Sequence, residues 1–600
     1  MEWGSQDPDD VDGRQIIATC KHYAAYDLER WEGANRHRFN AIVSMQDLVE
    51  YYMPPFRQCA RDSNVGSIMC SYNAVNGTPA CADPYLMQTV LREHWNWTSH
   101  GNYIVSDCNA VRNIYNDHKW VATAAQAAGK SYTAGCDNVC EATVGNTDMR
   151  GAYAQGLLSN ETIDTALRRQ YEGLVRANYW APTQDDDSGF RALGPADVNT
   201  QEAQNLARQA AVDGTVLLKN DGTLPIRFKS NQSVAVIGMW ANDRMRMLGN
   251  YNGRPPVYRT PVYAAQQLGL NVKYADGPVA RAANYSAALD AAKASDIILY
   301  FGGIDTSVET EDLDRTTITW PNVQLSLLSE LSSLGKPLVV VQMGTSVDNT
   351  PLLSNPNISS ILWAGYPGMF GGPAAFDIIS GAKAPAGRLP ITQYPGNYTS
   401  QVPMTDMSLR PSAANPGRTY KWYGSAVQPF GYGLHYTNFT VKLGMLDDGE
   451  EEGENRAKAD TPVFQMNELL DGCSERNKDR CAFASINIGI SNRGNTTSDF
   501  VALAFLMPQA GPTPFPRKEL AAYARERDIK PGETRQTALQ MKVGNLARID
   551  ASGNTVLYAG RYCLGIDVPE RERMCFEVRG KDMVLDVWPQ PKAGNGTSVY

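Results

Sequence analysis

The period of the hydrophobic pattern changes along this chain, and the change limits the possible folds more than any other feature. Over residues 14–180 and again over 201–400, short apolar runs alternate with longer amphipathic stretches. From Asn438 onward, apolar and polar side chains alternate with a period of two. The first pattern is typical of βαβ units on a parallel sheet, and the second of an antiparallel β-sandwich. The 600 residues are therefore expected to form a multidomain α/β plus all-β protein.

The first domain, residues 1–180, is expected to contain parallel strands that end at polar side chains. Strands are predicted at Gln15–Cys20, Gly66–Cys70, Asn102–Ser106 and Ser131–Ala134. They lead into Lys21-His22, Ser71-Tyr72-Asn73, Asp107 and Asp137. Functional groups at strand carboxyl ends are typical of a (β/α)8 barrel, which needs eight strands and about 250 residues. Only four strands are predicted here, so we expect a partial TIM-like barrel, about half of the complete one.

The rest of the chain divides into four further segments. Residues 181–200 are rich in Asp, Gly and Pro and are expected to be a linker. Residues 201–400 predict an α/β sandwich with a mostly parallel, doubly wound sheet. Residues 401–437 are a Pro/Gly/Tyr-rich connection, and 438–600 predict the β-sandwich. The acidic run Asp447–Glu454 is expected to be a solvated loop.

Charge and apolar run length exclude two classes of partner. The net charge of −9 argues against nucleic acid, because phosphate binding needs a basic face. The longest apolar runs, such as Pro337–Met343, fall far short of the roughly 20 residues that span a bilayer. We therefore expect neither a nucleic-acid nor a membrane partner.

Cysteines and glycosylation sequons predict an extracellular protein. Cys473 and Cys481, and Cys563 and Cys575, flank short turns, as expected for local disulfides, although buried thiols are the alternative. One of the eleven cysteines must remain unpaired. The Asn-x-Ser/Thr sequons predict N-glycans and lie at Asn76, Asn96, Asn160, Asn231, Asn284, Asn357, Asn397, Asn438, Asn495 and Asn595. The first ten residues lack the cationic start and apolar core of a signal peptide, so we expect the recorded sequence to lack its true start.

Several kinds of active site are absent from the sequence. There is no Walker loop, no His-Glu-x-x-His motif and no Gly-x-Ser-x-Gly elbow. The six histidines are scattered and the cysteines form no Cys-x-x-Cys pairs, so no metal or other cofactor is implied. The glycines of Gly365–Gly372 precede a helical stretch, where tight backbone packing is favoured over an anion site.

Two carboxylate sites remain as candidates for chemistry. Asp107 ends a predicted strand, where a helix N-cap is the alternative role. Five acidic residues lie in the loop Gly302–Arg315, which could also be a solvated loop. A carboxylate pair split between two domains, with a sugar between them, is the equipment of glycoside hydrolysis.

The order of several motifs resembles glycoside hydrolase family 3. The early motifs are Ala18-Thr-Cys-Lys-His-Tyr, Ser67-Ile-Met-Cys-Ser-Tyr-Asn and Ile104-Val-Ser-Asp-Cys. The later ones are Trp363-Ala-Gly-Tyr-Pro-Gly, Ala386-Gly-Arg-Leu-Pro and Phe430-Gly-Tyr-Gly-Leu. Within the family, Ser106–Cys108, Gly135–Asp137 and Ile304–Arg315 resemble the fungal and plant β-xylosidase branch. The resemblance covers nearly the whole chain and implies a barrel, an α/β sandwich and a fibronectin type III-like domain.

The resemblance also implies a reaction and its residues. A retaining, exo-acting enzyme would release xylose from the non-reducing ends of xylo-oligosaccharides, with Asp107 as the nucleophile. Glu309 is our choice for the acid/base, and Glu311 is its rival because the loop varies in length across the family. Lys21 and His22 match the family pair that binds sugar hydroxyls, and Tyr72 matches a tyrosine lining the same subsite.

Glucose differs from xylose by one additional hydroxymethyl group, so an enzyme that prefers xylose must exclude that group from its sugar-binding pocket. Our hypothesis is that Cys108 and Cys140 form a disulfide that narrows the pocket at that corner. A family 3 β-glucosidase and an α-L-arabinofuranosidase remain alternatives. The N-acetylglucosaminidase branch is rejected, because the chain lacks that branch's His/Asp dyad.

Relative to the family, this chain is expected to lack the first half of the barrel. The Lys-His pair lies midway round the barrel in the family but at residue 21 here. An acidic residue and an arginine that grip the sugar would be missing, and exposed strand edges predict poor solubility. An inert sugar-binding or interaction protein is therefore a further alternative. Substrate length, oligomeric state and sequon occupancy stay open.

Overall fold

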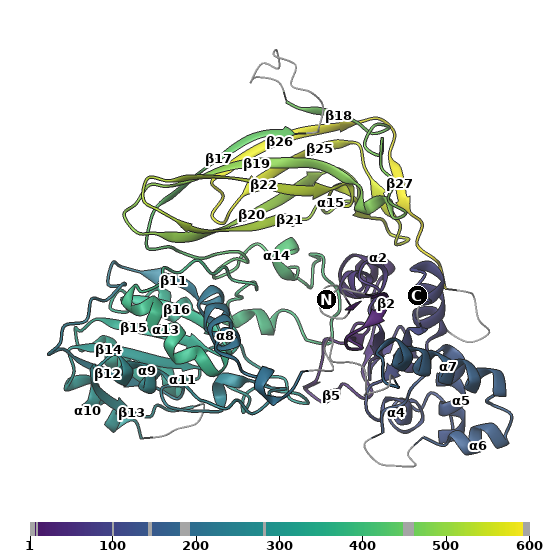
Figure 1. The fold of residues 1–600 in the computed structure, drawn as a ribbon, viewed down its shortest axis with the longest axis horizontal. Coiled ribbons are helices and arrows are strands. Elements are labelled where there is room, and N and C mark those ends of the chain that lie inside the picture. The colour runs from purple at the N-terminus through teal and green to yellow at the C-terminus, as the bar shows by residue number, and fades with distance from the viewer. Residues whose placement is uncertain are drawn as a thin grey trace.

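The computed structural model describes residues 6–7, 10–98, 101–141, 147–180, 193–279, 284–447 and 461–591. Three parts follow one another along the chain, as Figure 1 shows. Two of them contain helices and parallel strands, and the third, in green to yellow, is built from β-strands and lies above both. The change of hydrophobic period therefore corresponds to a change of architecture.

The first part is centred on a three-stranded parallel sheet in the order β10-β7-β3. The strands are β3 (Thr19–Tyr23), β7 (Ser67–Cys70) and β10 (Tyr103–Ser106). Ser106 and Tyr23 both pair with Cys70, so the carboxyl ends of all three strands lie at one edge. Lys21 and His22 lie on β3 itself and not after it. Cys20 and Tyr23 are buried and Lys21 is exposed, and the pairing with β7 shifts register between Cys20 and Tyr23.

The predicted fourth strand, Ser131–Ala134, is wrong. These residues form the last turn of helix α5 (Ala124–Ala134), which Thr123 caps by accepting a hydrogen bond from the Gln126 N–H. The alanine-rich run outweighs the strand preference of Tyr132 and Thr133 near its end. The extended chain comes later, where Asn138 forms an isolated parallel bridge with Val105 of β10.

Helices and short strands complete the first part. The helical segments are α2 (Met45–Asp47), η1 (Leu48–Tyr52), α3 (Pro54–Arg57), η2 (Gln58–Asp62), η3 (Ala80–Ala82), η4 (Tyr85–His94), α4 (Ala110–Asn116), α6 (Met149–Ala154) and α7 (Asn160–Arg176). The short strands are β1 (Gln6–Asp7), β2 (Asp10–Arg14), β4 (Arg30–Trp31), β5 (Ala34–Asn35), β6 (Asn40–Ala41), β8 (Ala74–Val75) and β9 (Thr78–Pro79).

The second part has a six-stranded sheet in the order β11-β16-β15-β14-β12-β13. The strands are β11 (Val216–Asn220), β12 (Ser233–Ile237), β13 (Asn271–Ala275), β14 (Ile297–Gly303), β15 (Leu338–Met343) and β16 (Ser360–Gly365). Five are parallel, as predicted, and β11 is an antiparallel edge strand that the sequence analysis did not identify.

Helices cover both faces of this sheet. Alternate residues of β14 enter two separate cores, Leu299 and Phe301 on one face and Ile298 and Tyr300 on the other. The helical segments of this part are η7 (Pro195–Asp197), α8 (Gln201–Gly214), η8 (Arg246–Leu248), α9 (Pro261–Gln267), α10 (Ser286–Lys293), α11 (Asn322–Ser332), α12 (Thr350–Leu353), η9 (Gly368–Phe370) and α13 (Gly371–Ser380). Tight backbone packing at Gly372 is confirmed, since a Cβ there would lie 2.2 Å from the Thr260 carbonyl oxygen.

A connection with η10 (Gly396–Ser400) and α14 (Thr419–Trp422) leads to the third part. Its strands are β17 (Phe439–Asp447), β18 (Val463–Gln465), β19 (Ala482–Asn492), β20 (Ser498–Gln509), β21 (Glu519–Ile529), β22 (Thr534–Lys542), β23 (Arg548–Ile549), β24 (Thr555–Leu557), β25 (Gly560–Ile566), β26 (Glu572–Arg579) and β27 (Met583–Asp586), with η11 (Lys478–Arg480) and α15 (Val543–Leu546) between them. They form sheets of three, five and three strands. Strand β21 carries a run of charged side chains at Arg525–Asp528, so its second half does not show the apolar–polar alternation.

Several predictions fall wholly or partly outside the described residues. They are most of the linker, most of the acidic run Asp447–Glu454 and the sequon at Asn595. Within the described segments, every helix is too short or too polar to cross a bilayer.

Five disulfides form among the described residues. They are Cys20–Cys59, Cys70–Cys81, Cys108–Cys140, Cys473–Cys481 and Cys563–Cys575. The two local pairs predicted from spacing are confirmed, and Cys563 and Cys575 lie directly opposite each other on β25 and β26. The cysteine left over is Cys136, which is buried.

Candidate active site

Asp107 lies at the edge of the parallel sheet where three strands end. Its backbone N–H donates to the Cys70 carbonyl at 3.0 Å, which continues the β10–β7 pairing by one residue. The carboxylate accepts the Cys108 N–H at 2.8 Å, and its side chain is 13% exposed. Asp107 does not cap the next helix, because Asn109 is the residue that precedes α4. The backbone of the turn thus holds Oδ1, and Oδ2 faces His22.

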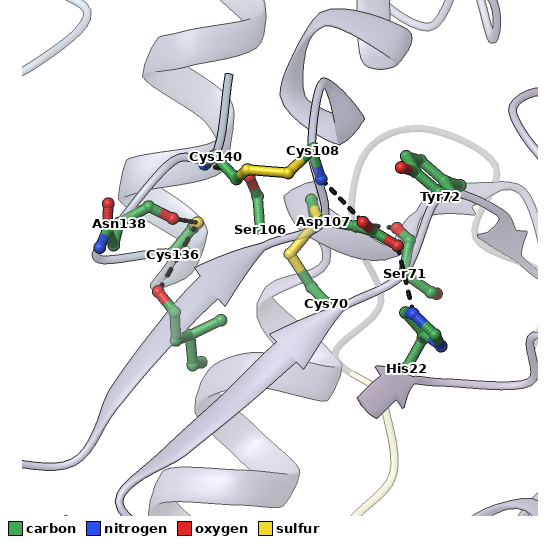
Figure 2. The surroundings of a disulfide bond; sticks show 12 residues. His22, Cys70, Ser71, Tyr72, Ser106, Asp107, Cys108, Cys136, Asn138 and Cys140 are labelled. Atoms are coloured by element: carbon green, nitrogen blue, oxygen red, sulfur yellow. Dashed lines mark hydrogen bonds and ion pairs between the residues drawn. A yellow bond between two sulfur atoms is a disulfide. The ribbon is translucent and has the colours of Figure 1, made fainter. Parts of the chain in front are cut away.

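His22 reaches Asp107 from β3, two strands away. Its Nε2 lies 3.5 Å from Asp107 Oδ2, as Figure 2 shows. Burial lowers the pKa of His22 and the carboxylate of Asp107 opposes this effect. Lys21, the neighbouring residue, places its Nζ 4.3 Å from the ring centroid of Tyr251 in the second part.

Tyr72, from the end of β7, completes the group of predicted residues around Asp107. Burial raises its pKa, and the negative charge of Asp107 raises it further. The Tyr72 ring lies 4.7 Å from the His37 ring, and the Arg36 guanidinium lies 4.8 Å from the Tyr72 centroid. The strand ends thus bring Lys21, His22, Tyr72 and Asp107 together.

The acidic loop after β14 contributes Glu311 to the same region. Its Oε2 accepts from the Tyr251 hydroxyl at 2.8 Å and its Oε1 accepts from Arg36 Nη1 at 2.9 Å. These two hydrogen bonds lower the pKa of Glu311. The charge of Glu311 in turn weakly opposes the lowering of the His22 pKa by burial and adds to the raising of the Tyr72 pKa by burial and Asp107.

Glu309 faces a different environment. Its carboxylate pairs with Arg315 Nε at 2.8 Å and accepts a hydrogen bond from the Thr345 hydroxyl. It lines a cavity of about 290 Å³ together with Trp31, Arg315 and Tyr398. Asp107, His22 and Tyr72 do not line this cavity. In this conformation Glu311, and not Glu309, contacts the groups around Asp107.

Arg36 and Tyr251 are site residues that the sequence analysis missed. Arg36 lies on the hairpin after β3, and its side chain is only 11% exposed. Tyr251 lies in a loop of the second part and is 72% exposed. Proximity of Arg36 to the Lys-His pair was a usable signal, whereas nothing in the local sequence distinguishes Tyr251.

The Cys108–Cys140 disulfide, which was our hypothesis, is confirmed. Figure 2 shows it directly beside Asp107. The Cys140 N–H donates to Ser106 Oγ at 3.0 Å, and the Asn109 N–H donates to the Cys140 carbonyl at 2.9 Å. The backbone on both sides of Asp107 is therefore tied to the segment that carries Cys140.

Two nearby groups have structural roles. Asp137 forms buried ion pairs with Arg92 at 2.6 Å and Arg169 at 2.7 Å, away from Asp107. The Cys136 thiol contacts the Asn138 carbonyl at 3.3 Å, and burial raises its pKa to about 12. Over the described residues, no three His, Cys, Asp or Glu side chains gather as metal ligands would.

The arrangement places two carboxylates, from different parts of the chain, around a region lined by Lys21, His22, Tyr72 and Arg36. One carboxylate can attack a carbon while the other gives and takes a proton. This division of roles suits transfer of a glycosyl group.

Known proteins share this sequence and fold. Residues 4–171 match the glycosyl hydrolase family 3 N terminal domain, and residues 215–436 match the glycosyl hydrolase family 3 C-terminal domain. A probable exo-1,4-beta-xylosidase of Neosartorya fischeri is 49% identical over 589 residues, covering 96% of this chain and 74% of that protein. The exo-1,4-beta-xylosidase of Emericella nidulans is 44% identical, with 98% and 75% covered.

Solved structures agree with the sequence comparison. A family 3 exo-beta-xylosidase in complex with a xylobiose aziridine probe superposes with a TM-score of 0.90 at 39% identity, covering 97% of this chain and 74% of that one. A beta-glucosidase from Listeria innocua shares the fold, with a TM-score of 0.77 at 21% identity over 94% of this chain and 75% of its own. By sequence and by structure, the chain belongs to glycosyl hydrolase family 3.

Proposed function

We propose that this chain is a retaining, exo-acting β-D-xylosidase that releases xylose from the non-reducing ends of xylo-oligosaccharides. The observation that carries the proposal is 44–49% identity, over 96–98% of this chain and 74–75% of the relatives, to proteins named exo-1,4-beta-xylosidases. The superposition on an exo-beta-xylosidase that holds a xylobiose-derived probe supports the same substrate class.

In the proposed first step, an Asp107 carboxylate oxygen attacks the anomeric carbon. The bond from that carbon to the leaving oxygen breaks, and the leaving oxygen takes a proton from the acid/base. In the second step, the deprotonated acid/base removes a proton from water, whose oxygen displaces Asp107. Xylose leaves with its original anomeric configuration, and both carboxyl groups return to their starting protonation states.

Glu311 is the acid/base we propose, in place of our first choice, Glu309. Its hydrogen bonds to Arg36 and Tyr251 and its electrostatic effect on His22 and Tyr72 support this choice. Glu309 is held by Arg315 and Thr345 instead.

Lys21, His22 and Tyr72 are the proposed contacts to sugar hydroxyls. Lys21 and His22 offer donors beside Asp107, and His22 at 3.5 Å can bridge a hydroxyl and that carboxylate. Arg36 lies against both Tyr72 and Glu311 and is a further candidate for this group. We propose no cofactor.

The Cys108–Cys140 disulfide is the proposed source of xylose preference. The disulfide lies next to Asp107 and restricts the movement of the turn there. A turn that cannot move would leave too little space in the sugar-binding pocket for the hydroxymethyl group of glucose. β-Glucosidase and α-L-arabinofuranosidase activities are the alternatives, and relative rates on the three glycosides distinguish them.

At a finer level, we propose that the parallel sheet of the first part belongs to a (β/α)8 barrel and that the third part is fibronectin type III-like. Strand ends that carry the site residues support the first proposal. The second proposal is supported by the sheets β17-β19-β22 and β18-β26-β25-β20-β21, which are antiparallel except for the β18–β26 pair and contribute to one core.

We further propose an extracellular, N-glycosylated protein. The disulfides support an oxidising compartment. Eight sequon asparagines are exposed among the described residues. Asn76 is the exception: it is buried and exchanges hydrogen bonds with the Val43 backbone, so we expect it to carry no glycan.

Nitrophenol release from an aryl β-xyloside tests the main proposal. We expect the wild-type chain to be active and Asp107→Asn to lose about 10⁴-fold or more in kcat, because an amide cannot act as the nucleophile. Asp290→Asn, at an exposed position on α10, is the matched control and should keep full activity. A folded wild-type chain that releases no nitrophenol would exclude the proposal.

A further inference from the structure

Glu311 lies at the tip of a tight turn. The backbones of Thr310 and Leu313 exchange hydrogen bonds at 3.0 Å in both directions. Between them Asp312 has a φ of 65°, a conformation that aspartate tolerates better than most residues. The direction of the Glu311 side chain therefore depends on what holds this turn in place.

On its C-terminal side, Asp314 fixes the turn to the first part of the chain. One oxygen of its carboxylate accepts the backbone N–H groups of Glu29 at 2.7 Å and Arg30 at 2.9 Å. The Asp314 N–H donates to the Arg30 carbonyl at 3.2 Å. These bonds join segments 285 residues apart in the sequence.

Glu29 holds the turn from the opposite direction. Its Oε2 accepts the Asp312 N–H at 2.9 Å and Arg36 Nη1 at 3.0 Å. The same Arg36 nitrogen donates to Glu311. The other carboxylate oxygen of Glu29, Oε1, accepts a hydrogen bond from the Tyr26 hydroxyl at 2.8 Å. Glu29 is thus connected both to the backbone of the turn and, through Arg36, to the Glu311 carboxylate.

We infer that Asp314 and Glu29 are positioning residues that set the place of Glu311 relative to Asp107; the inference rests on the proposed function. Glu29 follows His22 by seven residues, on the connection that leaves β3. The contacts therefore tie the loop that carries one carboxylate to the strand end beside the other. Neither residue contacts Asp107 or needs to contact the sugar. A misplacement of about 1 Å can cost about 100-fold in rate.

Two substitutions at Asp314 separate geometry from charge. Asp314→Ala removes the acceptor of two backbone hydrogen bonds, whereas Asp314→Asn keeps an oxygen that can accept both. Asp550→Ala is the matched control, since one Asp550 oxygen accepts the N–H groups of Ser552 at 2.8 Å and Asn554 at 2.9 Å in the third part.

The activity test compares two leaving groups. Xylobiose needs a proton from the general acid, whereas dinitrophenolate leaves with little help. For Asp314→Ala we expect kcat/KM to fall about 100-fold on xylobiose but less than about 3-fold on dinitrophenyl β-xyloside. Asp314→Asn and Asp550→Ala should stay within about 3-fold of wild type on both substrates. An equal loss on both substrates, or no loss, would overturn the inference.

Hydrogen exchange measured by mass spectrometry tests the contacts without reference to activity. Peptides containing Glu29 and Arg30 should exchange faster in Asp314→Ala than in wild type, and Asp314→Asn should restore the wild-type rate. Unchanged exchange in Asp314→Ala would show that the contacts do not hold this segment. A wild-type chain inactive on every glycoside would overturn the proposed function and the catalytic part of this inference. The exchange data would still show whether Asp314 holds the backbone of Glu29 and Arg30.

Discussion

Glu311 accepts hydrogen bonds from donors on two parts of the chain. Arg36 comes from the hairpin after β3 and Tyr251 from a loop of the second part. Both donors stabilise the carboxylate form, and they lower its pKa. A general acid must hold its proton at the working pH, so these donors set the pH above which the proposed acid role is lost.

Removal of the Tyr251 hydroxyl should move the pH profile. In Tyr251→Phe the charged form of Glu311 loses one hydrogen bond, its pKa rises, and the protonated acid persists to higher pH. We therefore expect the basic limb of the kcat/KM profile to shift upward, measured with xylobiose as substrate.

Tyr285→Phe is the control for this prediction. Tyr285 donates to Glu330 at 2.8 Å on the surface of the second part, away from Asp107. Loss of the Tyr285 hydroxyl should leave the pH dependence of kcat/KM unchanged. A shift of the Tyr251→Phe limb to lower pH would contradict the assignment of Glu311.

At the scale of elements, the turn after β10 carries both the nucleophile and a disulfide. Ser106 Oγ and the Asn109 N–H bind the backbone of Cys140, and Cys108 binds its sulfur. A segment of only four residues is thus fixed at three points. Such a turn can exclude a substituent because it cannot move aside.

Opening this disulfide should relax sugar selectivity. In the variant Cys108→Ser/Cys140→Ser, we expect the ratio of kcat/KM for aryl β-glucoside over aryl β-xyloside to rise about 10-fold, the size of effect expected for one small substituent. The variant Cys473→Ser/Cys481→Ser, which opens a disulfide in the third part, should leave the ratio unchanged. An unchanged ratio in the first variant would remove the disulfide from the account of specificity.

At the scale of the molecule, the chain after β27 joins the third part to the first. Trp588 is 3% exposed, and its indole N–H donates to the Tyr85 hydroxyl of η4 at 2.7 Å. His94, also of η4, lies 3.0 Å from Asp586. Trp588 thus helps to anchor the β-rich part on the part that carries the nucleophile, together with the Arg61–Asp479 ion pair at 2.7 Å.

Trp588→Ala should destabilise the protein by about 3 kcal/mol or more, because it removes a large buried side chain and leaves Tyr85 without its donor. We expect a lower Tm by calorimetry. Val587→Ala, at a neighbouring side chain that is 70% exposed, should melt like the wild type. Equal Tm values for both variants would show that Trp588 anchors nothing.

The sequence by itself determined the features that follow from local hydrophobic periodicity and from residue type. Alternation of apolar runs predicted the three parallel strands of the first part, and polar residues at their ends together with the family resemblance indicated Lys21, His22, Tyr72 and Asp107 as site residues. Cysteine spacing predicted the two local disulfides. These features depend on near neighbours, or on the rule that parallel strands share one carboxyl edge.

Only the tertiary structure decided the roles of residues whose surroundings come from distant segments of the chain. Glu309 and Glu311 are alike in sequence, and a turn held 285 residues away along the chain determines which one faces Arg36 and Tyr251. Ser131–Ala134 has strand-like composition but is drawn into a helix that begins at Ala124. For the glutamates the deciding contacts come from distant segments, whereas at Ser131–Ala134 the alanine-rich helix that starts seven residues earlier outweighs a short strand-like pattern.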